Sequence, residues 1–165
     1  MKVLVSACLL GENCKYNGGN NHCPEVVKFL EGKEVLPICP EMLAGMGCPR
    51  TPMEIVNGVL TDRDGNNLDS QMRDGIEGAL EMLGQQDIQC AVLQSRSPTC
   101  GVRQVYDGSF SGKLVPGSGL FAQALREAGY MVLDAQDIVN GESFDPKGEY
   151  AWLFVGNPER ISDGR

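Results

Sequence analysis

Cysteine is the residue type with the clearest capacity for chemistry in this sequence, because the chain of 165 residues contains seven cysteines. An odd number cannot all pair with one another in disulfides within the chain. Reduced thiols that converge on one point are good ligands for zinc, copper(I) or iron–sulfur clusters. No two cysteines have the CxxC spacing and His22 is the only histidine, so the common zinc-finger and zinc-ribbon patterns are absent.

The start of the chain imitates a lipoprotein cleavage box, with Lys2 ahead of apolar residues and the box itself ending at Cys8. The apolar stretch before the box has only about five residues, fewer than the roughly 7–15 of a secretory signal. We therefore expect a cytoplasmic protein with reduced thiols. In that compartment, clustered cysteines indicate metal binding or catalysis rather than disulfides.

The elements that must position these thiols are predicted β-strands. Cys8, Cys39 and Cys100 each follow a short apolar run, Cys100 within the polar loop 95–101 that comes after its run. The predicted strands are 3–6, 34–38, 88–94 and 130–133, and the predicted helices between them are 24–32, 68–83 and 120–128. This alternation predicts a three-layer α/β/α, Rossmann-like fold with a short, mainly parallel sheet. Ligands bind at the carboxyl ends of such strands, so the three thiols are expected at one rim.

The remaining segments are less regular. Residues 39–52 carry three prolines and two glycines and are expected to form a loop of fixed shape, and 61–67 a polar turn. Residues 106–114 are expected to form a hairpin or an irregular β segment. We expect one domain over 1–165, with its core in about 1–135. The last thirty residues are ambiguous and hold an apolar patch at Trp152 and Phe154.

Composition excludes several classes of protein. Hydrophobic residues make up 42% and charged residues 22%, which is the usage of a folded globular protein. No apolar run approaches the roughly 20 residues of a membrane span, so no membrane partner is expected. The net charge of −8 disfavours a nucleic acid polymer as partner. A small ligand, including a single base, remains open.

The residues alone leave alternatives open at every candidate position. The three thiols could be metal ligands or small buried hydrophobic residues, and the second interpretation suits Cys90, which lies inside an apolar strand. Glu41 could be a solvated loop carboxylate or the first residue of a helix. Ser97, before a proline, could be an ordinary turn hydroxyl. Arg50 and Glu54 are expected to form a structural ion pair.

A glycine pair precedes the predicted helix at 120–128. Gly117, Ser118 and Gly119 resemble a cradle for an anion at a helix N-terminus. Two glycines are weak evidence for such a site. We expect a tight turn into the helix instead.

Four separated phrases resemble the bacterial thiouracil desulfidase family, long catalogued as a domain of unknown function. They are VSACLLG at 5–11 with Cys14 and Tyr16, CPE at 39–41, PRTPMEI at 49–55 and SRSPTCG at 95–101. The resemblance covers about residues 1–133 in matching order.

The resemblance implies a [4Fe-4S] enzyme whose cluster is held by Cys8, Cys39 and Cys100, with one iron left open for the sulfur of the substrate. It implies non-redox desulfuration of a thiolated nucleobase such as 2-thiouracil, which gives uracil and hydrogen sulfide. Glu41 would be the base that takes a proton from water, and Ser97 would position the substrate or relay a proton. The expected partner is a small thiolated base, and the expected assembly a monomer or homodimer.

Other residues of these phrases are expected around the ligands without coordinating metal. Cys14 is expected to line the pocket beside Arg50 and Glu54, with roles as an alternative ligand or sulfur acceptor left open. Cys23 and Cys48 are expected to be incidental, although Cys48 could substitute for Cys39 as a ligand.

Two functions of other classes remain as alternatives. The first is a non-catalytic zinc or iron–sulfur binding module. The second is a metal-free sulfur carrier with a persulfide on Cys8 or Cys100. A carrier needs a thiol of lowered pKa, which Arg96 and Arg103 near Cys100 could supply.

Overall fold

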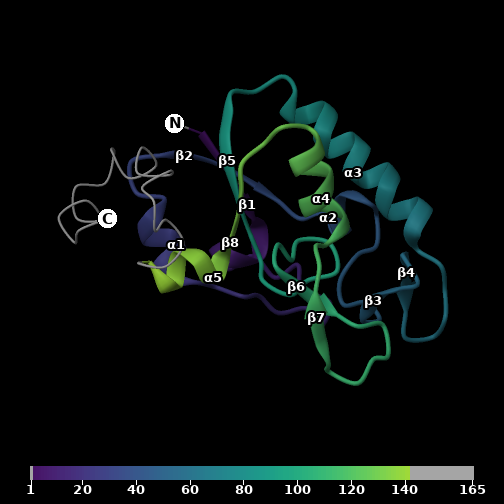
Figure 1. Cartoon of the computed structure of the whole chain (residues 1–165). Coiled ribbons are helices and arrows are strands. Elements are labelled where there is room, and N and C mark those ends of the chain that lie inside the picture. Colours follow the sequence, from purple (N-terminus) through teal and green to yellow (C-terminus); the bar gives the residue numbers. More distant parts are fainter. Residues whose placement is uncertain (1, 142–165) are drawn as a thin grey trace.

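The computed structural model describes residues 2–141, and its centre is a parallel sheet of four strands in the order β2-β1-β5-β8 (Figure 1). The strands are β1 (Lys2–Ser6), β2 (Glu34–Ile38), β5 (Ile88–Leu93) and β8 (Val132–Asp134). The helices are α1 (Pro24–Phe29), α2 (Pro40–Leu43), α3 (Asp69–Leu83), α4 (Leu120–Glu127) and α5 (Ala135–Asn140). The predicted Rossmann-like α/β fold is confirmed.

The central strands β1 and β5 are buried on both faces along most of their length, which explains their nearly continuous apolar sequences. In β1, Val3 and Val5 face one side of the sheet and Leu4 faces the other. The first side packs against α1 and α5, and the second against α3 and α4 (Figure 1). Phe29 of α1 and Phe121 of α4 are both fully buried, and complete burial of a side chain of this size stabilises the fold by about 1.5–3 kcal/mol.

The order in which the parallel strands are added to the sheet reverses at β1. The chain passes from β1 to β2 on one side, and later returns to place β5 on the other side of β1. Such a reversal leaves a crevice outside the carboxyl ends of the central strands. The short 3-10 helix η1 (Ala7–Leu10) directly follows β1 at this point.

The segment between β2 and α3 has more regular structure than expected. Residues 39–52 are not entirely loop, because Pro40 starts the four-residue helix α2, whose first turn carries Glu41. The turn expected within 61–67 is present at Arg63 and Asp64, but it follows an antiparallel hairpin of β3 (Met53–Val56) and β4 (Val59–Asp62) that was not expected. Asn57 and Gly58 both have positive φ, 50° and 80°, as a tight two-residue hairpin turn requires.

A second hairpin confirms the β structure expected around 106–114. It consists of β6 (Gln104–Tyr106) and β7 (Leu114–Pro116). Its loop packs against the first hairpin, since a Cβ placed on Gly108 would lie 2.7 Å from the Ile55 carbonyl oxygen. The two hairpins are therefore neighbours beyond the edge of the main sheet (Figure 1).

The last thirty residues are described only in part. Helix α5 covers Ala135–Asn140, and the expected patch at Trp152 and Phe154 lies outside the described residues. Between residues 2 and 141, no helix is both long and apolar enough to cross a membrane.

Candidate metal and substrate site

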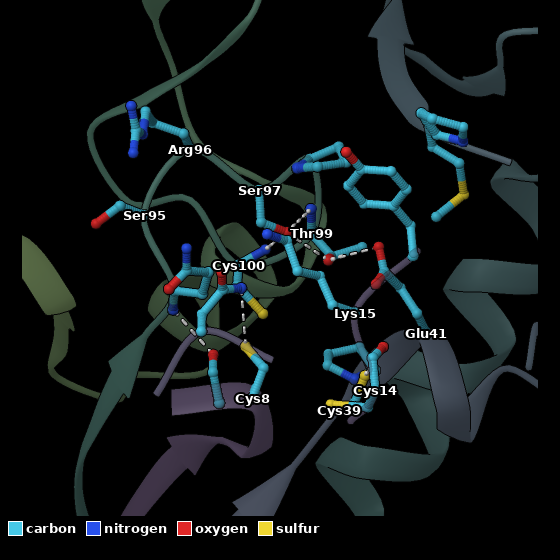
Figure 2. A pocket seen from close by; sticks show the side chains of 18 of the residues that line it. Cys8, Cys14, Lys15, Cys39, Glu41, Ser95, Arg96, Ser97, Thr99 and Cys100 are labelled. Atoms are coloured by element: carbon cyan, nitrogen blue, oxygen red, sulfur yellow. Dashed lines mark hydrogen bonds between the residues drawn. The ribbon is translucent and has the colours of Figure 1, made fainter. Parts of the chain in front are cut away.

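A pocket of about 430 Å³ opens at the carboxyl ends of β1, β2 and β5. Cys8, Cys39 and Cys100 all line it, together with Glu41 and Ser97 (Figure 2). The fold thus brings together five residues that are up to 92 positions apart in the sequence.

Each of the three thiols is placed by the element that ends at the pocket. Cys8 lies in η1, where its sulfur accepts a hydrogen bond from the Asn21 side-chain amide at 3.5 Å. Cys39 is the residue between β2 and α2. Cys100 lies in the loop after β5 and is only 5% exposed.

Burial dominates the acidity of these thiols. Burial raises the pKa of Cys8, although the Asn21 hydrogen bond opposes part of that rise. Burial also raises the pKa of Cys100 well above its ordinary value. Both groups are therefore protonated near neutral pH unless a positive partner stabilises the thiolates, and a coordinated metal is such a partner.

This acidity argues against the persulfide carrier. A carrier needs a lowered pKa at its nucleophilic thiol, whereas the pKa of Cys100 is raised. Arg103 is engaged elsewhere, because its guanidinium pairs with the Asp137 carboxylate. The possibility that Arg96 and Arg103 lower the pKa of Cys100 finds no support in the structure, because that pKa is raised.

Cys14 is a fourth thiol in the pocket. It is 7% exposed and lines the cavity beside Cys39 (Figure 2). Burial raises the pKa of Cys14, and the charge of Cys39 and its hydrogen bond with Cys14 add to this rise, to about 12.

The remaining cysteines lie outside this pocket. Cys90 is completely buried in the hydrophobic core, with 0% solvent exposure, and does not line the cavity. Cys48 donates a hydrogen bond to the Asn13 carbonyl oxygen at 3.1 Å. Cys23 begins helix α1.

The loop that carries Ser97 and Cys100 is held by the start of helix α4. The backbone N–H of Leu120 donates to the Pro98 carbonyl oxygen at 3.0 Å, and that of Phe121 to the Thr99 carbonyl oxygen at 2.9 Å. A Cβ on Gly119 would lie 2.4 Å from the Thr99 carbonyl carbon, so only glycine fits there. The helix N-terminus therefore binds the site loop, in agreement with a tight turn and not with an anion cradle.

Ser97 organises this loop through its side chain. Its Oγ accepts hydrogen bonds from the backbone N–H groups of Thr99 and Cys100, both at 3.1 Å. It also lies 2.9 Å from the Thr99 Oγ1. Thr99 was not among the predicted site residues, and its position two residues after Ser97 and directly before Cys100 is the signal that could have found it.

The two carboxylate oxygens of Glu41 have different partners. One of its carboxylate oxygens, Oε2, pairs with the Arg50 guanidinium. The other, Oε1, accepts a hydrogen bond of 3.5 Å from Thr99 Oγ1 (Figure 2). Glu41 is therefore neither a solvated loop carboxylate nor an unpartnered base.

The expected ion pair between Arg50 and Glu54 is wrong. The hairpin β3–β4 carries Glu54 to the second hairpin, where its Oε1 accepts the N–H groups of Gly108 at 2.9 Å and Phe110 at 3.1 Å. Arg50 pairs with Glu41 instead.

The outer wall of the pocket is aromatic and basic. Side chains of the two hairpins, of the loop after η1 and of the loop after β5 form this wall. They include Tyr16, Tyr106, Phe110, Lys15, Arg63 and Arg96. Planar rings beside positive groups suit a planar heterocycle as ligand.

The donor set has the chemistry that an iron–sulfur cluster requires, because cluster irons are held by cysteine thiolates. Three thiols from three separate strand ends share one pocket. Within residues 2–141, no three His, Cys, Asp or Glu side chains are close enough to form a site for a single metal ion. The fit to a cluster therefore rests on the shared pocket and the thiol chemistry.

Fold and pocket together define a Rossmann-like α/β protein with a cysteine-lined ligand site at the point where the strand order reverses. The chain belongs to the 2-thiouracil desulfurase family, whose sequence model matches residues 3–137. The expected family membership is confirmed.

Two known proteins resemble the chain over most of its length. The uncharacterized protein YbbK of Bacillus subtilis (strain 168) is 32% identical over 146 residues, which is 82% of this chain and 97% of YbbK. The solved structure of the [4Fe-4S]-dependent thiouracil desulfidase TudS superimposes with a TM-score of 0.78 at 32% identity. That match covers 84% of this chain and 93% of TudS.

Proposed function

We propose that this protein is a [4Fe-4S]-dependent desulfidase that converts a thiolated nucleobase such as 2-thiouracil into the oxo base and hydrogen sulfide. The observation that carries the proposal is the single pocket shared by three strand-end thiols, Glu41 and Ser97. Membership of the 2-thiouracil desulfurase family and the likeness to TudS support it.

Cys8, Cys39 and Cys100 would hold the cluster, and Cys14 would lie beside it. A cluster held by three thiolates has one iron without a protein ligand, and supplies a soft Lewis acid for the sulfur of a thiocarbonyl group. Replacement of sulfur by oxygen at carbon changes no oxidation state, so the reaction needs no external electrons.

The chain's own residues orient the base and move protons. The aromatic side chains Tyr16, Tyr106 and Phe110 would hold the planar ring. Glu41, fixed by Arg50, would accept the proton of the water that attacks the thiocarbonyl carbon. Ser97 would receive that proton or fix the ring through its hydroxyl.

We place this reaction in the cytoplasm, with the chain as a monomer or homodimer. All seven cysteines are free thiols, and free thiols persist in a reducing compartment.

The test is to purify or reconstitute the protein without oxygen and to measure iron, acid-labile sulfide and turnover of 2-thiouracil. We expect about four irons per chain and release of uracil with hydrogen sulfide. Zinc, or no metal, under these conditions would contradict the proposal.

The Glu41→Gln variant separates an enzyme from a binding module. It keeps the shape of the side chain but removes the base, so we expect full iron content and turnover reduced by at least about 100-fold. Full iron with no turnover in the unmodified protein, toward 2-thiouracil and other thiolated bases, would instead favour the non-catalytic module.

A further inference from the structure

Thr99 occupies the space between the two side chains assigned to proton transfer. Its Oγ1 lies 2.9 Å from Ser97 Oγ and 3.5 Å from Glu41 Oε1. It is 1% exposed and lines the pocket. Figure 2 shows the three side chains as one continuous series of hydrogen bonds.

The direction of this series follows from the hydrogen-bonding capacity of a hydroxyl group, which has one O–H donor and two acceptor lone pairs. The backbone N–H groups of Thr99 and Cys100 occupy both lone pairs of Ser97 Oγ. Ser97 can then only donate to Thr99 Oγ1. Thr99 in turn has its own proton available for the Glu41 carboxylate, which can only accept.

The middle of the series and its Glu41 end are fixed by other parts of the fold. The Arg50 guanidinium occupies Glu41 Oε2 and leaves Oε1 for Thr99. The Thr99 backbone is fixed because its carbonyl oxygen accepts the N–H groups of Phe121 at 2.9 Å and Ala122 at 3.1 Å. The hydroxyl of Thr99 therefore has little freedom to turn elsewhere.

We propose that Thr99 is a positioning residue that carries the proton of the attacking water from Ser97 to Glu41, an inference that rests on the proposed function. Ser97 gives its proton to Thr99 as Thr99 gives its own to Glu41 Oε1. Ser97 Oγ then has a third lone pair, which takes a proton from water. The hydroxide oxygen bonds to the thiocarbonyl carbon, and the C=S π electrons move to sulfur.

The later half of the reaction restores the protons. The C–S bond breaks as the C=O bond of the product forms, and the sulfur departs as hydrogen sulfide with two protons, the one that Glu41 held and the one that the added hydroxyl group loses. Each hydroxyl ends with the number of protons with which it began, and no electrons are gained or lost. The 3.5 Å link between Thr99 and Glu41 is the one that must shorten during catalysis, as catalytic hydrogen bonds commonly do when substrate binds.

The test compares Thr99→Val, which keeps the branched shape without the hydroxyl, with Thr99→Ser, which keeps the hydroxyl without the methyl group. We expect Thr99→Val to retain its iron and its KM for 2-thiouracil while kcat falls about 100-fold. Thr99→Ser should recover most of that loss. A merely structural threonine would show the opposite order, because valine preserves the packing better.

A second measurement is independent of turnover and of the behaviour of the variants. Neutron diffraction from deuterated crystals of the unmodified protein should place the Ser97 deuterium toward Thr99 Oγ1 and the Thr99 deuterium toward Glu41. A Thr99 deuterium directed at Ser97 would overturn the relay.

The outcomes separate this inference from the function on which it rests. An unmodified protein with a full cluster that desulfurises no thiolated base would remove the proposed function and the relay together. An active unmodified protein whose Thr99→Val variant has the same kcat would overturn the relay alone.

Discussion

The Arg50 guanidinium and the Glu41 carboxylate form an ion pair at the edge of the pocket, with side chains only 7% and 15% exposed. The same guanidinium donates to the carbonyl oxygens of Cys14 at 2.8 Å and Gly47 at 2.6 Å. Arg50 thus joins the loop after η1, the loop after α2 and the proposed base. The positive charge of Arg50 holds the Glu41 carboxylate in place more firmly than packing alone would.

Removal of Arg50 is expected to destabilise the protein, because it leaves the Glu41 carboxylate buried without its partner. Arg50→Met should lower the free energy of unfolding by about 3 kcal/mol, and the double variant with Glu41→Gln should lose less than the sum of the two single changes. Urea unfolding of the metal-free protein measures both.

Arg73 provides the matched control for this prediction. It pairs with Asp69 on the surface of α3 and is 58% exposed, so Arg73→Met should change stability by less than about 1 kcal/mol. Equal losses from Arg50→Met and Arg73→Met would contradict a special role for the buried pair.

Serine substitutions are expected to show which of the four pocket thiols bind the cluster. Serine at Cys8, Cys39 or Cys100 should reduce the iron content of anaerobically reconstituted protein from about four per chain to below about one. Cys14→Ser should keep its iron, because we assign it no bond to the cluster. Cys90→Ser is the control in the core and should also keep its iron. Iron at the unmodified level in all three ligand variants would refute the assignment.

Glu54 is expected to affect substrate binding more than chemistry. Its carboxylate holds the loop that carries Phe110, so Glu54→Ala leaves two N–H groups unpaired and loosens one wall of the pocket. We expect KM for 2-thiouracil to rise about tenfold, since a hydrogen-bond loss of roughly 1–2 kcal/mol corresponds to that factor. The kcat should change little.

Glu54→Gln is the paired variant, because its side-chain oxygen can still accept both bonds. It should bind substrate nearly as well as the unmodified protein. If Glu54→Ala lowered kcat and left KM unchanged, the positioning role would be wrong.

Cys90 is expected to make stability fall at alkaline pH. Burial raises its pKa to about 12, whereas the thiol of the unfolded chain ionises near 8.5. The folded state therefore holds the proton more tightly, and this contribution to stability is complete below about pH 8.5 and is lost as the pH rises toward 12.

Unfolding measurements with reductant between pH 9 and 10.5 test this contribution. The free energy of unfolding should fall more steeply for the unmodified protein than for Cys90→Ala, by up to about 1.4 kcal/mol per pH unit. The comparison is made between slopes, because the smaller side chain also changes stability at every pH. Equal slopes would show that Cys90 is not held protonated by the fold.

The main strands could be predicted because each is a short apolar run that ends at Gly, Pro or polar residues, and their parallel direction because they alternate with helices. Their order in the sheet was not predicted. The same pattern placed Cys8, Cys39 and Cys100 at one rim. The partners of Arg50 could not be predicted, because four-residue spacing brings two side chains together only on a helix, and the hairpin β3–β4 turns Glu54 away. The turn of that hairpin was predictable from Asn57 and Gly58. The position of Thr99 directly before Cys100 could have placed it in the site, but its hydrogen bond to Glu41, 58 residues away along the chain, leaves no signal in the sequence.

The two hairpins that form most of the outer wall of the pocket are separate two-stranded sheets outside the parallel sheet. Residues that would hold the cluster and move protons come instead from the strand ends and from the loop tied to α4. Variation in the hairpins can therefore alter which heterocycle is admitted while the reacting groups stay in place. Under the proposed function, selection and protein engineering could change the substrate range of this scaffold without replacing the residues of the proposed catalytic centre.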